Sequence, residues 1–133
     1  MTAHVLMLSS SRQGDEAYLE HARSLILAHL GGIRDLLFIP YAAVTQSYDN
    51  YVSAVATALP ECNVTGIHTF DHPVKAINNA KANNQAIVVG GGNTFHLMHT
   101  IYQQNLLEPL QHAIAEGTPY IGWSAGSNIC GQS

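Results

Sequence analysis

The sequence predicts an α/β fold in which a doubly wound, mostly parallel sheet is sandwiched between helices. Short apolar runs alternate with helical patterns almost from the first residue. In addition, 47% of the 133 residues are hydrophobic and only 11% are charged, whereas globular proteins average about 25% charged residues. Alternating strands and helices imply parallel strands with right-handed crossovers, and a sheet covered on both faces needs this much apolar surface.

Five short apolar runs are expected to be strands. Each ends at glycine, proline or polar residues, which is typical of buried strands. The expected strands are His4–Leu8, Leu36–Ile39, Val64–His68, Ala86–Val89 and Tyr120–Trp123.

Helical patterns fill the intervals between these strands. Glycine or proline marks several of their ends. The expected helices are Asp15–Leu30, Tyr48–Leu59, Pro73–Ala82, Thr94–Tyr102 and Leu106–Ala115. Ligands of doubly wound sheets bind at the carboxyl ends of the strands. Function is therefore expected in the loops 9–14, 40–47, 68–72, 90–94 and 122–126.

Composition and charge exclude several classes of protein. The net charge is −4 and the five basic residues are scattered, so no basic stripe is available for nucleic acid. No apolar run approaches the roughly 18 residues of a membrane span, and no signal-peptide pattern opens the chain. Two cysteines are too few for a disulfide scaffold. A cytoplasmic protein without nucleic-acid or membrane partners is predicted.

The strongest chemical signal is the sequence Gly122-Trp123-Ser124-Ala125-Gly126. It fits the Gly-x-Ser-x-Gly nucleophile elbow, with a strand before it and a helix expected after it. Such a turn presents the serine hydroxyl above the amides of the next helix, which can stabilise an oxyanion. A plain structural turn is the alternative interpretation of the pattern alone.

A second signal is the run Gly90-Gly91-Gly92-Asn93-Thr94 at the end of an apolar strand. Three glycines allow close approach of a ligand and leave backbone amides pointing outward. The spacings of nucleotide-binding glycine loops are absent. An oxyanion donor opposite Ser124 is the better interpretation.

Four segments together resemble peptidase E, the α-aspartyl dipeptidase family. They are Phe38–Gln46, Val64–His68, Val88–Phe95 and Tyr120–Gly126. The similarity runs over nearly the whole chain, in order and with matching spacing. Trp123 before the serine resembles peptidase E more than cyanophycinase, a relative with the same general elbow.

The resemblance implies a class I glutamine amidotransferase-like fold, with serine in place of the cysteine of those enzymes. It implies that Ser124 is the nucleophile and that the amides of Gly92 and Ala125 form the oxyanion hole. Asn93 and Thr94 would lie beside the substrate, a small peptide with an N-terminal aspartate. No metal or organic cofactor is implied.

A serine nucleophile needs a base, usually histidine held by an acid, and the residues after Ser124 include neither. We therefore expect residues 1–133 to be the N-terminal part of a single hydrolytic domain, inactive or nearly so alone. The partner that completes it would be a C-terminal segment or a second copy of the chain. His68, after the third strand, is the one histidine expected near the site; His96 and His99 lack a third metal ligand.

Three alternatives remain open from the sequence. The first is a cyanophycinase-like peptidase, against which the Trp123 context argues. The second is a glutaminase-type acyl transferase, which Ser124 in place of cysteine disfavours. The third is a noncatalytic domain that keeps the elbow as a pocket for a ligand or a partner.

Overall fold

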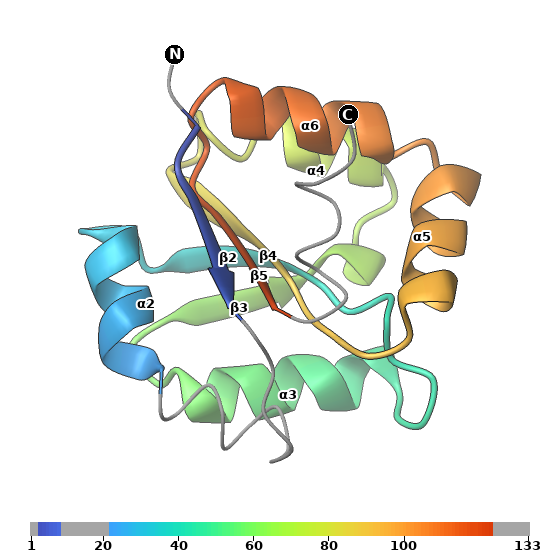
Figure 1. Ribbon diagram of the computed structural model, residues 1–133, viewed down its shortest axis with the longest axis horizontal. Coiled ribbons are helices and arrows are strands. Elements are labelled where there is room, and N and C mark those ends of the chain that lie inside the picture. Colours follow the sequence, from blue (N-terminus) through green and yellow to red (C-terminus); the bar gives the residue numbers. More distant parts are fainter. Residues whose placement is uncertain (1–2, 9–21, 124–133) are drawn as a thin grey trace.

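The computed structural model describes residues 3–8 and 22–123 and shows one five-stranded sheet (Figure 1). The strand order is β1-β5-β4-β2-β3, and all the pairings are parallel. The strands are β1 (Val5–Leu8), β2 (Asp35–Ile39), β3 (Asn63–Gly66), β4 (Gln85–Val89) and β5 (Tyr120–Trp123). The helices are α2 (Arg23–Leu30), α3 (Tyr48–Ala58), η1 (Ile67–Thr69, a 3₁₀ turn), α4 (Pro73–Asn78), α5 (Thr94–Gln103) and α6 (Leu107–Ala115). The predicted α/β class is confirmed.

Helices cover both faces of the sheet, as Figure 1 shows for α3 on one side and α4 and α6 on the other. The alternation of strand side chains decides which residues each layer covers. Leu36 and Phe38 of β2 pack with α2 and α3, whereas Leu37 and Ile39 pack with α4, α5 and α6. The apolar runs are continuous because both faces of these strands are buried.

The helix ends are defined by local chemistry. The Ser47 hydroxyl accepts from the Asn50 amide at 3.0 Å and caps α3, a bond typically contributing about 1 kcal/mol. The Asn93 side chain caps α5 in the same way. Pro73 opens α4, and Gly31 ends α2 with a φ of 62°. None of the described helices combines the length and apolar character that a membrane crossing requires.

Two predicted elements end more than one residue away from the predicted position, and the start of the first predicted helix lies outside the described residues. The third strand ends at Gly66, and His68 lies instead in η1, because the pairing of β3 with β2 stops at Gly66 and the buried Ile67 turns into the core. The helix from Pro73 ends at Asn78, before a turn in which Asn84 has a φ of 57°. Of the first predicted helix, only Arg23–Leu30 is described as helix; residues 9–21 lie outside the described residues.

A pair of stacked histidines joins the end of α2 to the starts of β1 and β5. The rings of His4 and His29 are parallel, with centroids 4.1 Å apart. Nε2 of His4 donates to the His29 carbonyl at 2.7 Å, and Nε2 of His29 donates to the Tyr120 carbonyl at 3.2 Å. Burial, followed by the charge of His4, lowers the pKa of His29 below its ordinary value of 6.5, against the raising effect of the Tyr120 bond.

We expect stability to fall below about pH 6.5 because of His29. The pKa of His29 is lower in the folded protein, so the unfolded chain binds more protons at this side chain and the free energy of unfolding rises with pH. The stability that His29 contributes is fully present above its unfolded pKa and is lost as the pH falls toward its folded pKa. Urea midpoints at about pH 7.5 and about pH 5.5 measure this. The change of the urea midpoint between the two pH values should be smaller in His29→Asn, and His99→Asn should leave it as in wild type. An equal change in wild type and His29→Asn would contradict the role given to His29.

Candidate active site

The strands that lead into the two glycine-containing motifs end side by side at the carboxyl edge of the sheet. Strand β5 lies between β1 and β4, and Val89 of β4 is paired with Gly122 of β5. The chain therefore leaves β4 at Gly90 and β5 at Trp123 from neighbouring positions. Ser124 and Ala125 lie outside the described residues, so their predicted roles as nucleophile and oxyanion donor stay predictions.

The glycine turn is held tightly against the loop that follows β2. The Asn93 amide donates to the Ala42 carbonyl at 2.9 Å, and the Gly90 amide donates to the Ile39 carbonyl at 3.2 Å. Gly92 has a φ of 141°, and a Cβ on it would lie 2.5 Å from the Ala42 oxygen. A side chain at this position would be both strained and obstructed. Only glycine therefore allows the turn to lie this close to its neighbour.

Gly92 lies at this edge with no acceptor for its N–H among the described residues. The residue is exposed. A backbone donor at the carboxyl edge of a parallel sheet can serve an oxyanion. This geometry is compatible with the role predicted for Gly92.

Asn93 and Thr94 begin α5. The side-chain oxygen of Asn93 accepts from the His96 amide at 2.8 Å, so capping already uses that oxygen. Thr94 is the exposed first residue of the helix. Their contact with a substrate stays a prediction; the Asn93 side-chain N–H group is the part not engaged by the cap.

His68 is held on the flank of this edge, beside the start of α3. Its Nε2 lies 2.6 Å from Oδ1 of Asp49, and its ring lies edge-on against Tyr48 with centroids 5.5 Å apart. Its Nδ1 is buried and finds no partner within the described part of the chain. Binding of substrate by His68, which stays a prediction, would require the ring to leave Asp49.

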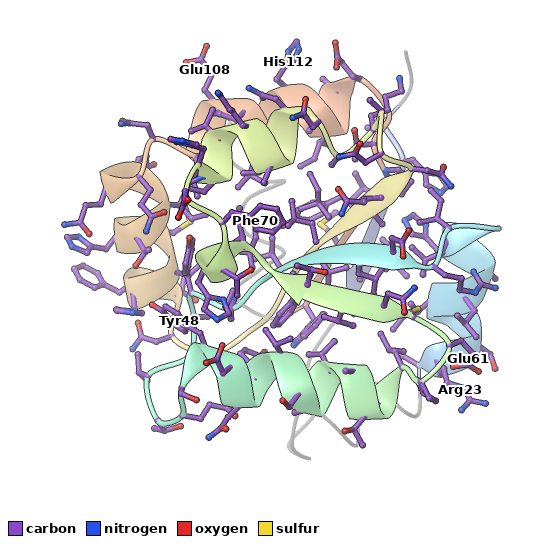
Figure 2. The ribbon with its side chains drawn as sticks, turned by 180° about the vertical axis from the view of Figure 1, so that it is seen from behind. Arg23, Tyr48, Glu61, Phe70, Glu108 and His112 are labelled. Carbon is purple, nitrogen blue, oxygen red and sulfur yellow. The ribbon has the colours of Figure 1, made fainter. Side chains whose placement is uncertain are left out.

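Tyr48 connects this flank to α5 and lines a groove. Figure 2 shows it at the start of α3, on the side of the molecule where α5 lies, and its hydroxyl is 3.3 Å from Nε2 of His96. The groove has a volume of about 430 Å³, within the usual range of about 300–1,000 Å³ for small-ligand sites. It is lined by Ala43, Val44, Gln46, Ser47, Tyr48 and His96.

The imidazoles of His96 and His99 have different neighbours. His96 is bonded to Tyr48, and the His99 ring lies parallel to Phe95 with centroids 6.4 Å apart. Across residues 3–8 and 22–123 there is no group of three or more histidine, cysteine, aspartate or glutamate side chains placed to hold a metal. The pair is accounted for by these separate contacts.

The side chain of Trp123 packs the end of β5 against the core. Its side chain is fully buried, and its ring stacks on Phe38 with centroids 5.9 Å apart and planes 17° apart. The residue before the predicted nucleophile is thus packed in the core between the sheet and the helices α2 and α3. This packing restrains the point at which the elbow leaves the sheet.

Sequence reasoning missed Tyr48, Asp49 and Tyr51 in the first turns of α3. Tyr51 is buried, and its hydroxyl donates to the Gly91 carbonyl at 2.9 Å. The available signal was a Ser47-capped helix after the second strand, with aromatic residues three apart. That spacing predicts a shared helix face but not its contact with a turn 40 residues away.

Comparisons with known proteins identify the family. A sequence profile described as Peptidase family S51 matches residues 5–133. Peptidase E of Shewanella sp. (strain W3-18-1) is 47% identical over 135 residues, which cover 100% of this chain and 56% of that protein. The chain thus spans little more than half the length of this relative.

Two crystal structures are similar to the chain. That of a Listeria monocytogenes EGD-e protein assigned as a peptidase E has a TM-score of 0.67 at 28% identity, covering 95% of this chain and 60% of the other. That of a peptidase from an acI-B1 Actinobacterium has a TM-score of 0.58 at 16% identity, over 94% and 57%, and shows the fold alone. With the profile match over residues 5–133, these findings establish that the chain belongs to peptidase family S51.

Proposed function

We propose that the protein is a serine peptidase that hydrolyses dipeptides with an N-terminal aspartate. Ser124 attacks the scissile carbonyl carbon, and the amides of Gly92 and Ala125 stabilise the resulting oxyanion. Collapse of this tetrahedral species releases the second residue as an amine and leaves an aspartyl ester on Ser124, which water then hydrolyses. The relatives named peptidase E support a peptidase, and the aspartyl substrate class is what the resemblance to the α-aspartyl dipeptidases implies.

The observation that best supports the proposal is that β4 and β5, which lead into the two glycine motifs, end at the same edge of the sheet. The pairing of Val89 with Gly122 puts the ends of β4 and β5 side by side, which supports the proposal that Gly92 and Ser124 act at one point. An oxyanion hole needs donors directed at one point from two segments. The groove beside Tyr48 and His96 is the candidate site for the second residue of the dipeptide.

The general base and its acid are proposed to come from outside these residues. After Ser124 the sequence contains no histidine, aspartate or glutamate. The chain as given should therefore be inactive or nearly so. A chain continued as in the longer relatives should be active.

Hydrolysis of α-aspartyl p-nitroanilide by both forms tests the proposal. The longer form should have a kcat/KM for this substrate about 10- to 200-fold higher than for the glutamyl analogue, the range for one methylene. It should not cleave N-acetylated α-aspartyl p-nitroanilide. A serine-directed fluorophosphonate should label Ser124 in the same form. Neither hydrolysis nor labelling in either form would instead indicate a noncatalytic binding domain on the same scaffold.

A further inference from the structure

Tyr51 lies in an aromatic cluster directly beneath the glycine turn. It is 2% exposed, and its ring meets Phe38 edge-on, with centroids 5.0 Å apart and planes 83° apart. Phe38 in turn stacks on Trp123. The three rings join α3, β2 and β5, so the phenol of Tyr51 has a well-defined position.

The Tyr51 hydroxyl sets the orientation of one peptide group. It donates to the Gly91 carbonyl at 2.9 Å in a buried bond. The described residues contain no cis peptide bond, and in a trans peptide the C=O and the following N–H point in opposite directions. Because the Gly91 oxygen is directed at Tyr51, the Gly92 N–H is directed away from it, toward the exposed side of the turn.

The neighbouring glycine makes this bond possible. A Cβ on Gly90 would lie 2.5 Å from the Tyr51 oxygen and 2.8 Å from Cζ of Phe38. A side chain there would displace the hydroxyl that holds Gly91. The turn is thus bonded on one side by Tyr51 and on the other by the Ala42 carbonyl, which accepts from Asn93.

We infer that Tyr51 is a positioning residue that holds the Gly91–Gly92 peptide so that the Gly92 amide is aimed at the oxyanion. The inference rests on the proposed function in its use of Ser124 chemistry. A glycine-rich turn has many accessible conformations, whereas an oxyanion donor is effective only if it is oriented before the charge develops. Tyr51 supplies that orientation without touching the substrate.

Tyr51→Phe tests this in the form of the protein that hydrolyses α-aspartyl p-nitroanilide. Removal of an oxyanion donor typically lowers kcat by about 10²–10³-fold. Loss of its orientation should cost less, about 10- to 100-fold in kcat, with KM changed less than about twofold. Tyr41→Phe is the matched control. Tyr41 is equally buried, and its hydroxyl donates to Gln104, at the end of α5, at 3.0 Å, so its kcat should stay within about twofold of wild type.

The amide resonance of Gly92 gives a readout that does not depend on activity. In ¹H–¹⁵N spectra of the ¹⁵N-labelled protein, Tyr51→Phe should shift the Gly92 cross-peak, and Tyr41→Phe should leave it in place. A Gly92 cross-peak that does not move in Tyr51→Phe overturns the inference. The inference is also overturned if Tyr51→Phe and Tyr41→Phe change kcat and KM to the same extent. If wild type shows no Ser124-dependent hydrolysis, the proposed function fails. The Gly92 cross-peak, compared between wild type and Tyr51→Phe of the 133-residue chain, then decides by itself whether Tyr51 holds the turn. Dispersed spectra verify that each variant is folded.

Discussion

Replacing Ser124 with alanine is expected to lower kcat for α-aspartyl p-nitroanilide by about 10⁶-fold in the active form of the protein, the loss typical for a serine nucleophile. Without the hydroxyl no ester can form, and the oxyanion hole alone leaves only weak catalysis. Initial rates on a mass-verified sample measure the effect. Substrate binding should change little, because alanine removes one small polar group.

Ser127→Ala is the matched control for this prediction. Ser127 follows the elbow motif by one residue and has no predicted chemical role. It should keep kcat within about threefold of wild type. Equal rates for Ser124→Ala and wild type would show that another nucleophile, or another protein in the sample, carries the hydrolysis.

Replacing Gly92 with alanine is expected to affect both stability and catalysis. The φ of 141° is unfavourable for any residue with a side chain, and the new Cβ would lie 2.5 Å from the Ala42 carbonyl oxygen. That oxygen belongs to the backbone and accepts the Asn93 amide, so it cannot move cheaply. We expect the free energy of unfolding to fall by about 2–4 kcal/mol and kcat to fall by about 10²–10³-fold as the amide is displaced.

Substitutions at two other glycines distinguish backbone strain from steric overlap of the added Cβ. Gly31 has a φ of 62° with nothing within 4 Å of an added Cβ, and Gly32 has open space without the unusual φ. Gly31→Ala should cost about 1–3 kcal/mol from backbone strain alone, and Gly32→Ala about 0–1 kcal/mol in either direction. Neither should change kcat. Urea denaturation measures the three stabilities; a Gly92→Ala variant as stable and active as Gly32→Ala would contradict the tight turn.

The strands and helices were predictable because their signals are local. Parallel strands buried on both faces appear as continuous apolar runs, such as Ala86–Val89 within β4. Helix starts such as Tyr48 follow a capping serine. The predicted strand end at His68 was wrong because the apolar run continues past Gly66, whereas the pairing with β2 stops there.

The α/β class was predictable from the sequence alone, and the elbow around Ser124 and the glycine run at Gly90 were predicted from their motifs. The position of β5 between β1 and β4, which pairs Val89 with Gly122, is seen only in the three-dimensional structure. That structure also decided that the Tyr51 hydroxyl reaches Gly91, 40 residues away. The physical reason is that helical crossovers allow parallel strands to be placed in many orders. Contacts between distant segments depend on that order and on side-chain packing, neither of which is encoded in any short stretch of the chain.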